Sequence, residues 1–249
     1  MKTWIAGPAL AAMLGCTAVA GPFDNLSEAD RAALHDEIRG YLLENPEILR
    51  EAMTELDRRE RAAQAARDIE LVEQHRDELV ADGYSNVLGN PEGDITIVEF
   101  LDYQCSYCKR AHPEIQALLE SDPDIRLIQK EYPILGPVSE MAARAASAVL
   151  IAEGPEVYTT FTDRMMSHEG PLNQQVIIGL AEESGVDIDR MLEMGNSDQV
   201  SEQLNRNIRL GQQMGISGTP TFIVEDEMLR GYAPASTFRG LIEAQRGEM

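Results

Sequence analysis

The segment from Ile95 to Cys108 limits the possible folds of this chain more than any other part. Its first seven residues, ITIVEFL, form an apolar, β-branched run that is typical of a buried strand. Cys105 and Cys108 follow after a short turn, and a helix is expected to begin just after Cys105. This order predicts an α/β sheet in which a buried strand delivers the first cysteine to the N-terminus of a helix.

The sequence after this segment predicts the remaining elements of one domain. Residues 125–128 form a second apolar strand, and about residues 138–210 are almost continuously helical, with breaks at glycine and proline. Short runs at 221–224 and 228–229 predict a hairpin, and a terminal helix follows. Strands separated by a helical block indicate one α/β domain, residues 89–249, which carries an inserted helical subdomain.

Residues 21–88 predict a charged helical arm before this domain. Asn45-Pro46 is expected to end its first helix. In the next helix Leu49, Met53 and Leu56 share a face, but the heptad then reaches a glutamate, so the pattern does not establish a long coiled coil. The apolar stripes either pack against each other, the following domain or copies of the chain, or they belong to a solvated helical linker.

The first twenty residues have the pattern of a secretory signal peptide. Lys2 precedes an apolar run that is too short for a permanent membrane anchor, and Ala18-Val19-Ala20 fits an A-x-A cleavage site. We therefore expect export into the periplasm, with cleavage near Ala20. Lipoprotein processing at Cys16 is the alternative, although the residues before Cys16 match a lipobox badly.

Charge and cysteine number narrow the function classes. The formal net charge of −22 makes nucleic acids and anionic membrane surfaces poor partners. Without the signal peptide, only Cys105 and Cys108 remain as cysteines. One pair is too little for a disulfide framework, and a purely structural bridge across such a short gap would add little stability. The pair is therefore expected to carry chemistry.

The positions of the two cysteines predict different roles. Cys105 at a helix N-terminus should have a pKa below the ordinary value of about 8.5, which suits a nucleophile. Cys108, about one turn further, can attack a mixed disulfide and release the substrate. Glu99 lies in the strand where alternation places it on a covered face, so a buried carboxyl can accept the proton of Cys108. An edge position open to water is the alternative for Glu99.

A metal site is the main alternative for the cysteine pair. Zinc normally takes four ligands, and the chain adds only four scattered histidines, His35, His75, His112 and His168. His112 precedes a proline and is expected to point to solvent. We therefore expect no zinc site and no cofactor, whereas binding of Cu(I) by the two thiolates is chemically reasonable. A periplasmic Cu(I)-binding protein of copper tolerance is thus the alternative function.

Thr219-Pro220 opens the predicted hairpin far downstream. A proline at the first position of a strand cannot donate to the ladder, and an X-Pro bond in a tight turn is where a cis peptide occurs. An isolated Thr-Pro is more often trans. The CxxC pair upstream favours the cis form.

Three separated segments resemble a known family. FLDYQCSYCKRAH (100–112), EYPILGPVSEMAA (131–143) and GISGTPTF (215–222) resemble the DsbA-like thiol-disulfide oxidoreductases, which have a thioredoxin fold with a helical insertion. The resemblance covers about residues 90–249. By position it implies roles for six residues: Cys105 as nucleophile, Cys108 as resolving thiol, Glu99 as buried acid, Pro220 as the cis-proline facing the thiols, Thr219 before it, and Pro113 as the proline that kinks the active-site helix.

The arm resembles a narrower group. LHDEIRGYLLENPEILREAMTELDRRE (34–60) is similar to the N-terminal region of ScsC proteins, the suppressor-of-copper-sensitivity relatives of DsbA. Members of that group can be trimers held by this arm, and some act as disulfide isomerases. The resemblance therefore implies a homo-oligomer formed through the arm.

The dipeptide between the cysteines differs from that of the strongly oxidising family members, which carry CPHC. Here it is Ser106-Tyr107, which holds no cation to stabilise the Cys105 thiolate. We therefore expect a weaker oxidant than DsbA. The expected activity is exchange of disulfides with unfolded or mispaired exported proteins, with a membrane redox partner that resets the dithiol. Whether the protein acts as oxidase, reductase or isomerase stays open at this point.

Overall fold

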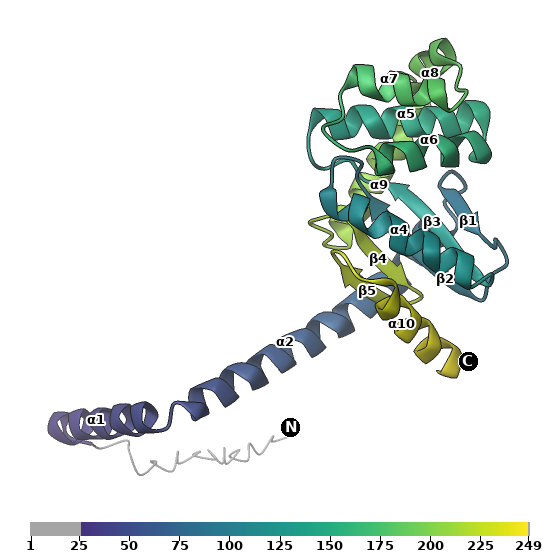
Figure 1. Cartoon of the computed structure of the whole chain (residues 1–249). Coiled ribbons are helices and arrows are strands. Elements are labelled where there is room, and N and C mark those ends of the chain that lie inside the picture. Colours follow the sequence, from purple (N-terminus) through teal and green to yellow (C-terminus); the bar gives the residue numbers. More distant parts are fainter. Residues whose placement is uncertain (1–25, 249) are drawn as a thin grey trace, which may run out of the picture. The chain divides into compact units, whose positions relative to one another are not determined.

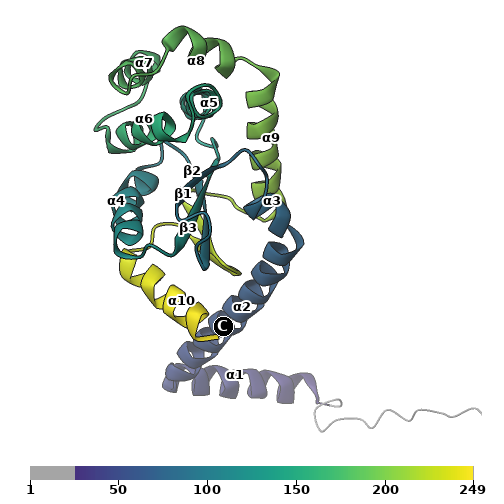
Figure 2. The ribbon, with the colours of Figure 1, turned by 90° about the vertical axis from the view of Figure 1, so that its right-hand side faces the viewer.

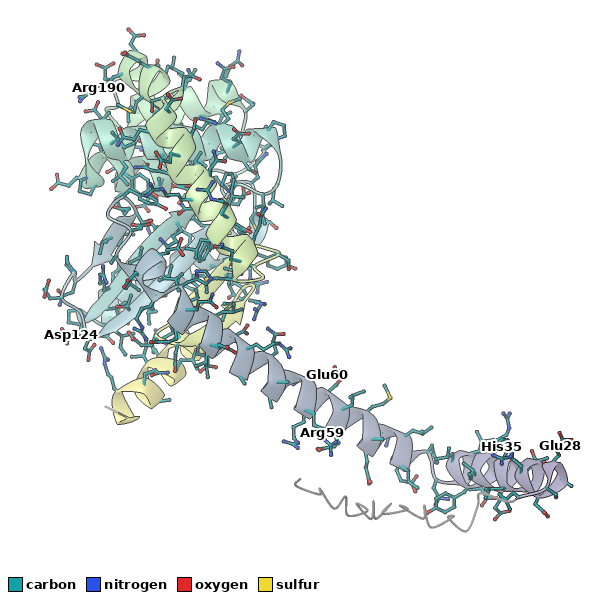
Figure 3. The ribbon with its side chains drawn as sticks, turned by 180° about the vertical axis from the view of Figure 1, so that it is seen from behind. Glu28, His35, Arg59, Glu60, Asp124 and Arg190 are labelled. Carbon is teal, nitrogen blue, oxygen red and sulfur yellow. The ribbon has the colours of Figure 1, made fainter. Side chains whose placement is uncertain are left out.

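The computed structural model describes residues 26–248, so the expected signal peptide and Cys16 lie outside the described residues. The chain divides into two compact units, one up to Arg59 and one from Glu60 onward. Arg59 and Glu60 are neighbours within one long helix (Figure 3).

Two helices make up the described part of the first unit. Helix α1 (Glu28–Glu44) begins after Ser27, whose hydroxyl accepts the backbone N–H of Asp30. It ends at Asn45, and helix α2 (Glu47–Gln74) starts after the proline that follows. The break expected at Asn45-Pro46 is therefore present. No residue of α1 is buried, which leaves its apolar side chains uncovered in the single chain.

A mixed five-stranded sheet forms the centre of the second unit. The strand order is β1-β3-β2-β4-β5, and only β2 and β3 run parallel. The strands are β1 (Asn86–Gly89), β2 (Ile95–Leu101), β3 (Ile125–Glu131), β4 (Thr221–Val224) and β5 (Glu227–Arg230). The sequence predicted the last four, with β3 three residues shorter, and missed β1.

Helices cover both faces of this sheet (Figure 2). On one face, Ile95 and Ile97 pack with α4 (Ser106–Ser121) and α10 (Ala235–Glu248). On the other, Val98 and Phe100 pack with the end of α2, with α3 (Arg76–Val80) and with the end of α9 (Asp198–Gln213). The central strand is therefore buried on both sides, as its continuous apolar run predicts.

The helical insertion spans residues 137–213 and contains five helices. Four of them lie together at one end of the sheet (Figure 1). These are α5 (Pro137–Glu153), α6 (Pro155–Ser167), α7 (Gln174–Glu183) and α8 (Ile188–Gly195). Cys105 and Cys108 belong to the same apolar cluster as these helices, so the two thiols lie where the sheet domain meets the insertion.

Two ion pairs attach the chain before β1 to the sheet. Lys130 of β3, which is fully buried, lies 2.6 Å from Asp82. Arg230 of β5 donates to Asp68 of α2 at 2.8 Å. Residues 60–88 of the expected arm thus lie in the second unit. No helix among residues 26–248 is long and apolar enough to cross a membrane.

Candidate active site

The turn between β2 and α4 is held by Asp102. One oxygen of its buried carboxylate accepts the N–H groups of Ile134 and Leu135, and the other accepts that of Gln104. Its backbone carbonyl accepts the N–H of Cys105 at 3.0 Å. Cys105 consequently becomes the N-cap residue of α4, as the sequence predicted. Asp102 itself was not singled out in the sequence, because its role depends on a loop that follows another strand.

The two thiols are not joined by a disulfide and differ in accessibility. The exposed fraction is 7% for Cys105 and 0% for Cys108. Only Cys105 can therefore be approached from outside without moving the helix.

The two thiols also differ in acidity. The hydrogen bond from Cys108 lowers the pKa of Cys105 to about 5; burial opposes this, and Thr219 and the backbone N–H groups of Tyr107 and Cys108 add to it. Burial is the largest cause of a strongly raised pKa for Cys108, followed by the neighbouring Cys105 and Glu99. At neutral pH the pair is one thiolate beside one thiol.

Glu99 lies on the sheet face that α4 covers and is 3% exposed. The covered position expected from strand alternation is therefore correct, and the edge position is excluded. Burial raises the pKa of Glu99, while Gln129 lowers it by donating to the carboxylate at 3.3 Å. The charge of Glu99 in turn raises the pKa of Cys108. Glu99 and the deeper thiol are therefore coupled electrostatically.

The loop before β4 closes the site opposite Cys105. The Thr219-Pro220 peptide bond is cis, as the sequence order favours. The Cys105 thiol donates to the Thr219 carbonyl oxygen, with Sγ and O 3.1 Å apart. The hydroxyl of Thr221 donates to the Gly218 carbonyl at 2.8 Å and fixes the exit of the loop.

A second buried acid, Glu131, lies two residues beyond Gln129 on the same strand face as Glu99. The hydroxyls of Tyr103 and Tyr158 both donate to its Oε1, at 2.6 and 2.8 Å. Burial raises the pKa of Glu131 to about 8, although the two tyrosines lower it. Strand alternation from Glu99 to the paired strand would have pointed to this residue, but no short motif marks it.

His112 does not point to solvent as expected, because α6 packs against α4 at this place. Its side chain is 13% exposed, and its Nε2 lies 3.2 Å from Asp163 of α6. On the outer side of α4, Ser106 and Tyr107 are exposed. A groove of about 680 Å³ runs from Ser106 along α4 to the α6–α7 loop. It offers room for a peptide next to Cys105.

Among residues 26–248, no three side chains of His, Cys, Asp or Glu are grouped so that they could hold a metal ion. The described site brings together the dithiol, the buried Glu99 and the cis-proline loop.

Two family models match this chain. The model of the DSBA-like thioredoxin domain matches residues 96–243, and that of the copper resistance protein ScsC N-terminal domain matches residues 30–63. A Na(+)/H(+) antiporter NhaA from Herminiimonas arsenicoxydans is 30% identical over 162 residues, 65% of this chain but 25% of the antiporter. The chain therefore spans about a quarter of the length of that curated relative.

Solved structures show the same similarity. A thioredoxin-like oxidoreductase from Silicibacter pomeroyi is 38% identical, with a TM-score of 0.66 over 69% of this chain and 98% of that one. A linker-deletion variant of ScsC from Proteus mirabilis is 25% identical, with a TM-score of 0.69 over 90% and 98% of the two chains. These matches confirm the predicted thioredoxin-like fold with a helical insertion and an N-terminal helical region.

Proposed function

The chain belongs to the family of DSBA-like thioredoxin domains, and from this premise we propose that it is an exported thiol-disulfide oxidoreductase acting on unfolded or mispaired proteins. The single observation that carries the proposal is the asymmetry of the dithiol. Cys105 has a pKa of about 5 and is the accessible thiol, whereas Cys108 is fully buried above Glu99. A nucleophile paired with a protonated resolving thiol is what disulfide exchange requires.

The proposed reaction balances with the groups of this site. The Cys105 thiolate attacks one sulfur of a substrate disulfide, the substrate S–S bond breaks, and the other substrate sulfur leaves as a thiolate. Cys108 then gives its proton to the Glu99 carboxylate and attacks Cys105 Sγ, so that the internal disulfide forms and the second substrate thiolate leaves. In the reverse direction, Glu99 returns the proton to Cys108 while a substrate thiolate attacks Cys105.

Pro220 and Thr219 are proposed to align the substrate beside Cys105. Cys105 Sγ lies 3.1 Å from the Thr219 carbonyl oxygen, which places this backbone at the reacting sulfur. A substrate segment there can form backbone hydrogen bonds with the partly exposed loop at Thr219, just before β4. Ser106 and Tyr107 are proposed to set how oxidising the pair is, because both flank the thiolate and neither carries a charge.

The arm is proposed to join copies of the chain, which favours isomerase activity. It matches the ScsC N-terminal model and exposes an apolar stripe on two helices. An isomerase gains from several dithiols around one substrate, and it needs the dithiol reduced by a membrane partner. The signal-like first twenty residues support the periplasm as the place of action.

The function is tested by insulin reduction and by refolding of scrambled ribonuclease. We expect the wild-type protein to catalyse exchange, Cys105→Ser to be inactive, and Cys108→Ser to accumulate mixed disulfides with the substrate. Activity that survives in Cys105→Ser would contradict the assignment of the nucleophile. A wild-type protein without activity in either assay would contradict the function itself.

Binding of Cu(I) by Cys105 and Cys108 is the second candidate function. The name of the arm's family model refers to copper resistance, and two thiolates suit this soft ion. Titration of the reduced protein with Cu(I), followed by insulin reduction with the metal-free protein, separates the two. Tight binding without exchange activity would favour the copper function.

A further inference from the structure

The loop that carries the cis-proline is attached to the core of the sheet by one tyrosine. Tyr132 directly follows β3 and is 2% exposed. Its hydroxyl donates to the carbonyl oxygen of Ile216 at 2.9 Å. Ile216 lies three residues before Thr219, whose carbonyl accepts the thiol of Cys105. A single side chain thus connects the sheet to the segment that touches the nucleophile.

Tyr132 is held on three sides, through its backbone and through two contacts of its ring, so its hydroxyl has a fixed direction. Its backbone N–H donates to the Leu101 carbonyl at 2.9 Å, and its ring meets Phe100 edge to face at 5.5 Å. The third side is Gly211 of α9, where a Cβ atom would lie only 2.4 Å from the ring. Helix α9 runs from the helical cluster to the sheet (Figure 3), and a glycine is required where it crosses this ring.

Ile216 is likewise constrained through both of its backbone polar groups, the N–H and the carbonyl. Its N–H donates to the Gly211 carbonyl at 2.8 Å, and its side chain is 4% exposed. Removing the Tyr132 hydroxyl would leave the buried Ile216 carbonyl without this donor, and a buried carbonyl without a partner is costly. The loop would then shift to regain a partner.

We propose that Tyr132 is a positioning residue for the dithiol, which holds Thr219 against Cys105 through Ile216. The inference rests on the proposed role of Cys105 as nucleophile. When Cys105 ionises, it loses the hydrogen that it donates to the Thr219 carbonyl. The Thr219 hydroxyl is buried, has no partner of its own, and can donate to the thiolate instead. A loop held in place keeps this donor within reach.

The test is Tyr132→Phe, which keeps the ring and removes only the hydroxyl. Tyr84→Phe is the matched control, because the Tyr84 hydroxyl also makes one long-range hydrogen bond, to Asn207 of α9, but does not touch the loop. The ionisation of Cys105 is followed by its alkylation rate against pH, with Cys108 replaced by Ser in all three proteins. We expect Tyr132→Phe to raise the pKa of Cys105 by about 0.5 unit, part of the effect of one hydrogen bond to a charge.

Amide hydrogen exchange of residues 215–219 gives a second readout that is independent of the chemistry. We expect faster exchange there in Tyr132→Phe and wild-type exchange in Tyr84→Phe. An unchanged pH profile in Tyr132→Phe, with an active wild-type protein, would overturn the inference. If the wild-type protein fails to exchange disulfides at all, the proposed function fails, and faster exchange in 215–219 would still show that Tyr132 holds the loop.

Discussion

At the scale of single residues, Glu131 gives the site a second titrating acid. Both tyrosine hydroxyls donate to Oε1, whereas Oε2 is buried without a partner. A carboxyl group with one saturated oxygen and one unpaired oxygen fits the neutral acid better than the carboxylate. The pKa of about 8 agrees with this, so Glu131 is mostly protonated at pH 7.

The raised pKa of Glu131 predicts how stability depends on pH. The folded state holds the Glu131 proton more tightly than the unfolded state does. The contribution of Glu131 to the free energy of unfolding is therefore complete below the ordinary pKa of 4.5 and is lost as the pH rises to about 8. Glu131→Gln keeps the acceptor oxygen and cannot ionise. Urea denaturation measures the free energy of unfolding of both proteins at each pH. As the pH rises from 5 to 8.5, we expect the difference, variant minus wild type, to increase by a few kcal/mol, because only the wild type loses the contribution of Glu131. A difference that does not vary with pH would contradict this prediction.

The two residues between the cysteines predict the strength of the oxidant. Ser106 and Tyr107 are both exposed, so changes there act on the thiolate rather than on packing. Tyr107→His places an imidazolium beside Cys105, stabilises the reduced form, and should raise the reduction potential by about 30 mV or more. Equilibration with glutathione measures it, and Tyr107→Phe is the control that should match wild type. A wild-type potential already as oxidising as that of DsbA would contradict the prediction.

Several site residues were accessible from the sequence because short patterns mark them. Cys105, Cys108 and Pro220 lie in recognisable segments, and strand alternation places Glu99 on the covered face. Asp102 and Tyr132 were not accessible, since the distant partners that reveal their roles lie 32 or more residues away. No short motif marks Glu131, although strand alternation could have pointed to it. The expected solvent position of His112 was wrong for the same reason, because α6 arrives from another part of the chain.

At the scale of elements, α2 is held to the sheet by one partly buried ion pair. Asp68 is 4% exposed and accepts two hydrogen bonds from Arg230 of β5. Burial alone would raise the pKa of Asp68, but the hydrogen bonds from Arg230 and Gln64 outweigh it and lower the pKa. The pair therefore stabilises the fold above the ordinary pKa of 3.8, and this contribution is lost as the pH falls below it.

Breaking this pair should loosen the second half of α2. We expect Asp68→Asn to lower the free energy of unfolding by about 1–3 kcal/mol at pH 7, between the values of surface and buried pairs. Amide exchange in residues 60–74 should become faster. Glu55→Gln removes a carboxylate that pairs with arginines on the exposed part of the same helix and should leave stability unchanged. Equal effects of both variants would show that the Asp68–Arg230 pair stabilises the fold no more than an exposed ion pair does.

The elements that the sequence predicted are those with their own periodicity. Strand β2 and the insertion helices have it, whereas β1 is a four-residue run, NVLG, that becomes a strand by pairing with β3. The boundary of the arm was equally hidden. Val72 lies on the same helix, α2, as the exposed Leu49, Met53 and Leu56, yet it is buried in the core of the second unit. Helical periodicity does not say which partner covers a face.

At the scale of the whole molecule, the exposed apolar stripe of the first unit predicts an assembly of copies of the chain. Leu49, Met53 and Leu56 of α2 have exposed fractions of 49%, 68% and 55%. They lie about one helical turn apart on one face, as the apolar side chains between the helices of a coiled coil do. An exposed apolar stripe of this kind is typical of an interaction surface, and we expect copies of the chain to cover it. Truncation to remove the arm should end at Arg59, because a longer deletion would strip Val72 and Leu79 from the core.

Substitutions within the stripe test both the assembly and the isomerase proposal without truncation. Replacing all three apolar residues by Gln keeps helix propensity and removes the seam, so we expect the oligomer to become a monomer in sedimentation or light scattering. Insulin reduction per dithiol should be retained, whereas refolding of scrambled ribonuclease should fall several-fold, because a monomer presents one dithiol to each substrate. The control carries Gln at Glu51, Thr54 and Arg58, which lie on the opposite, exposed face of α2 and should change neither property. Full isomerase activity in the monomeric variant would show that isomerisation does not depend on the arm. A wild-type protein that is itself a monomer would contradict the proposal that several dithiols act on one substrate.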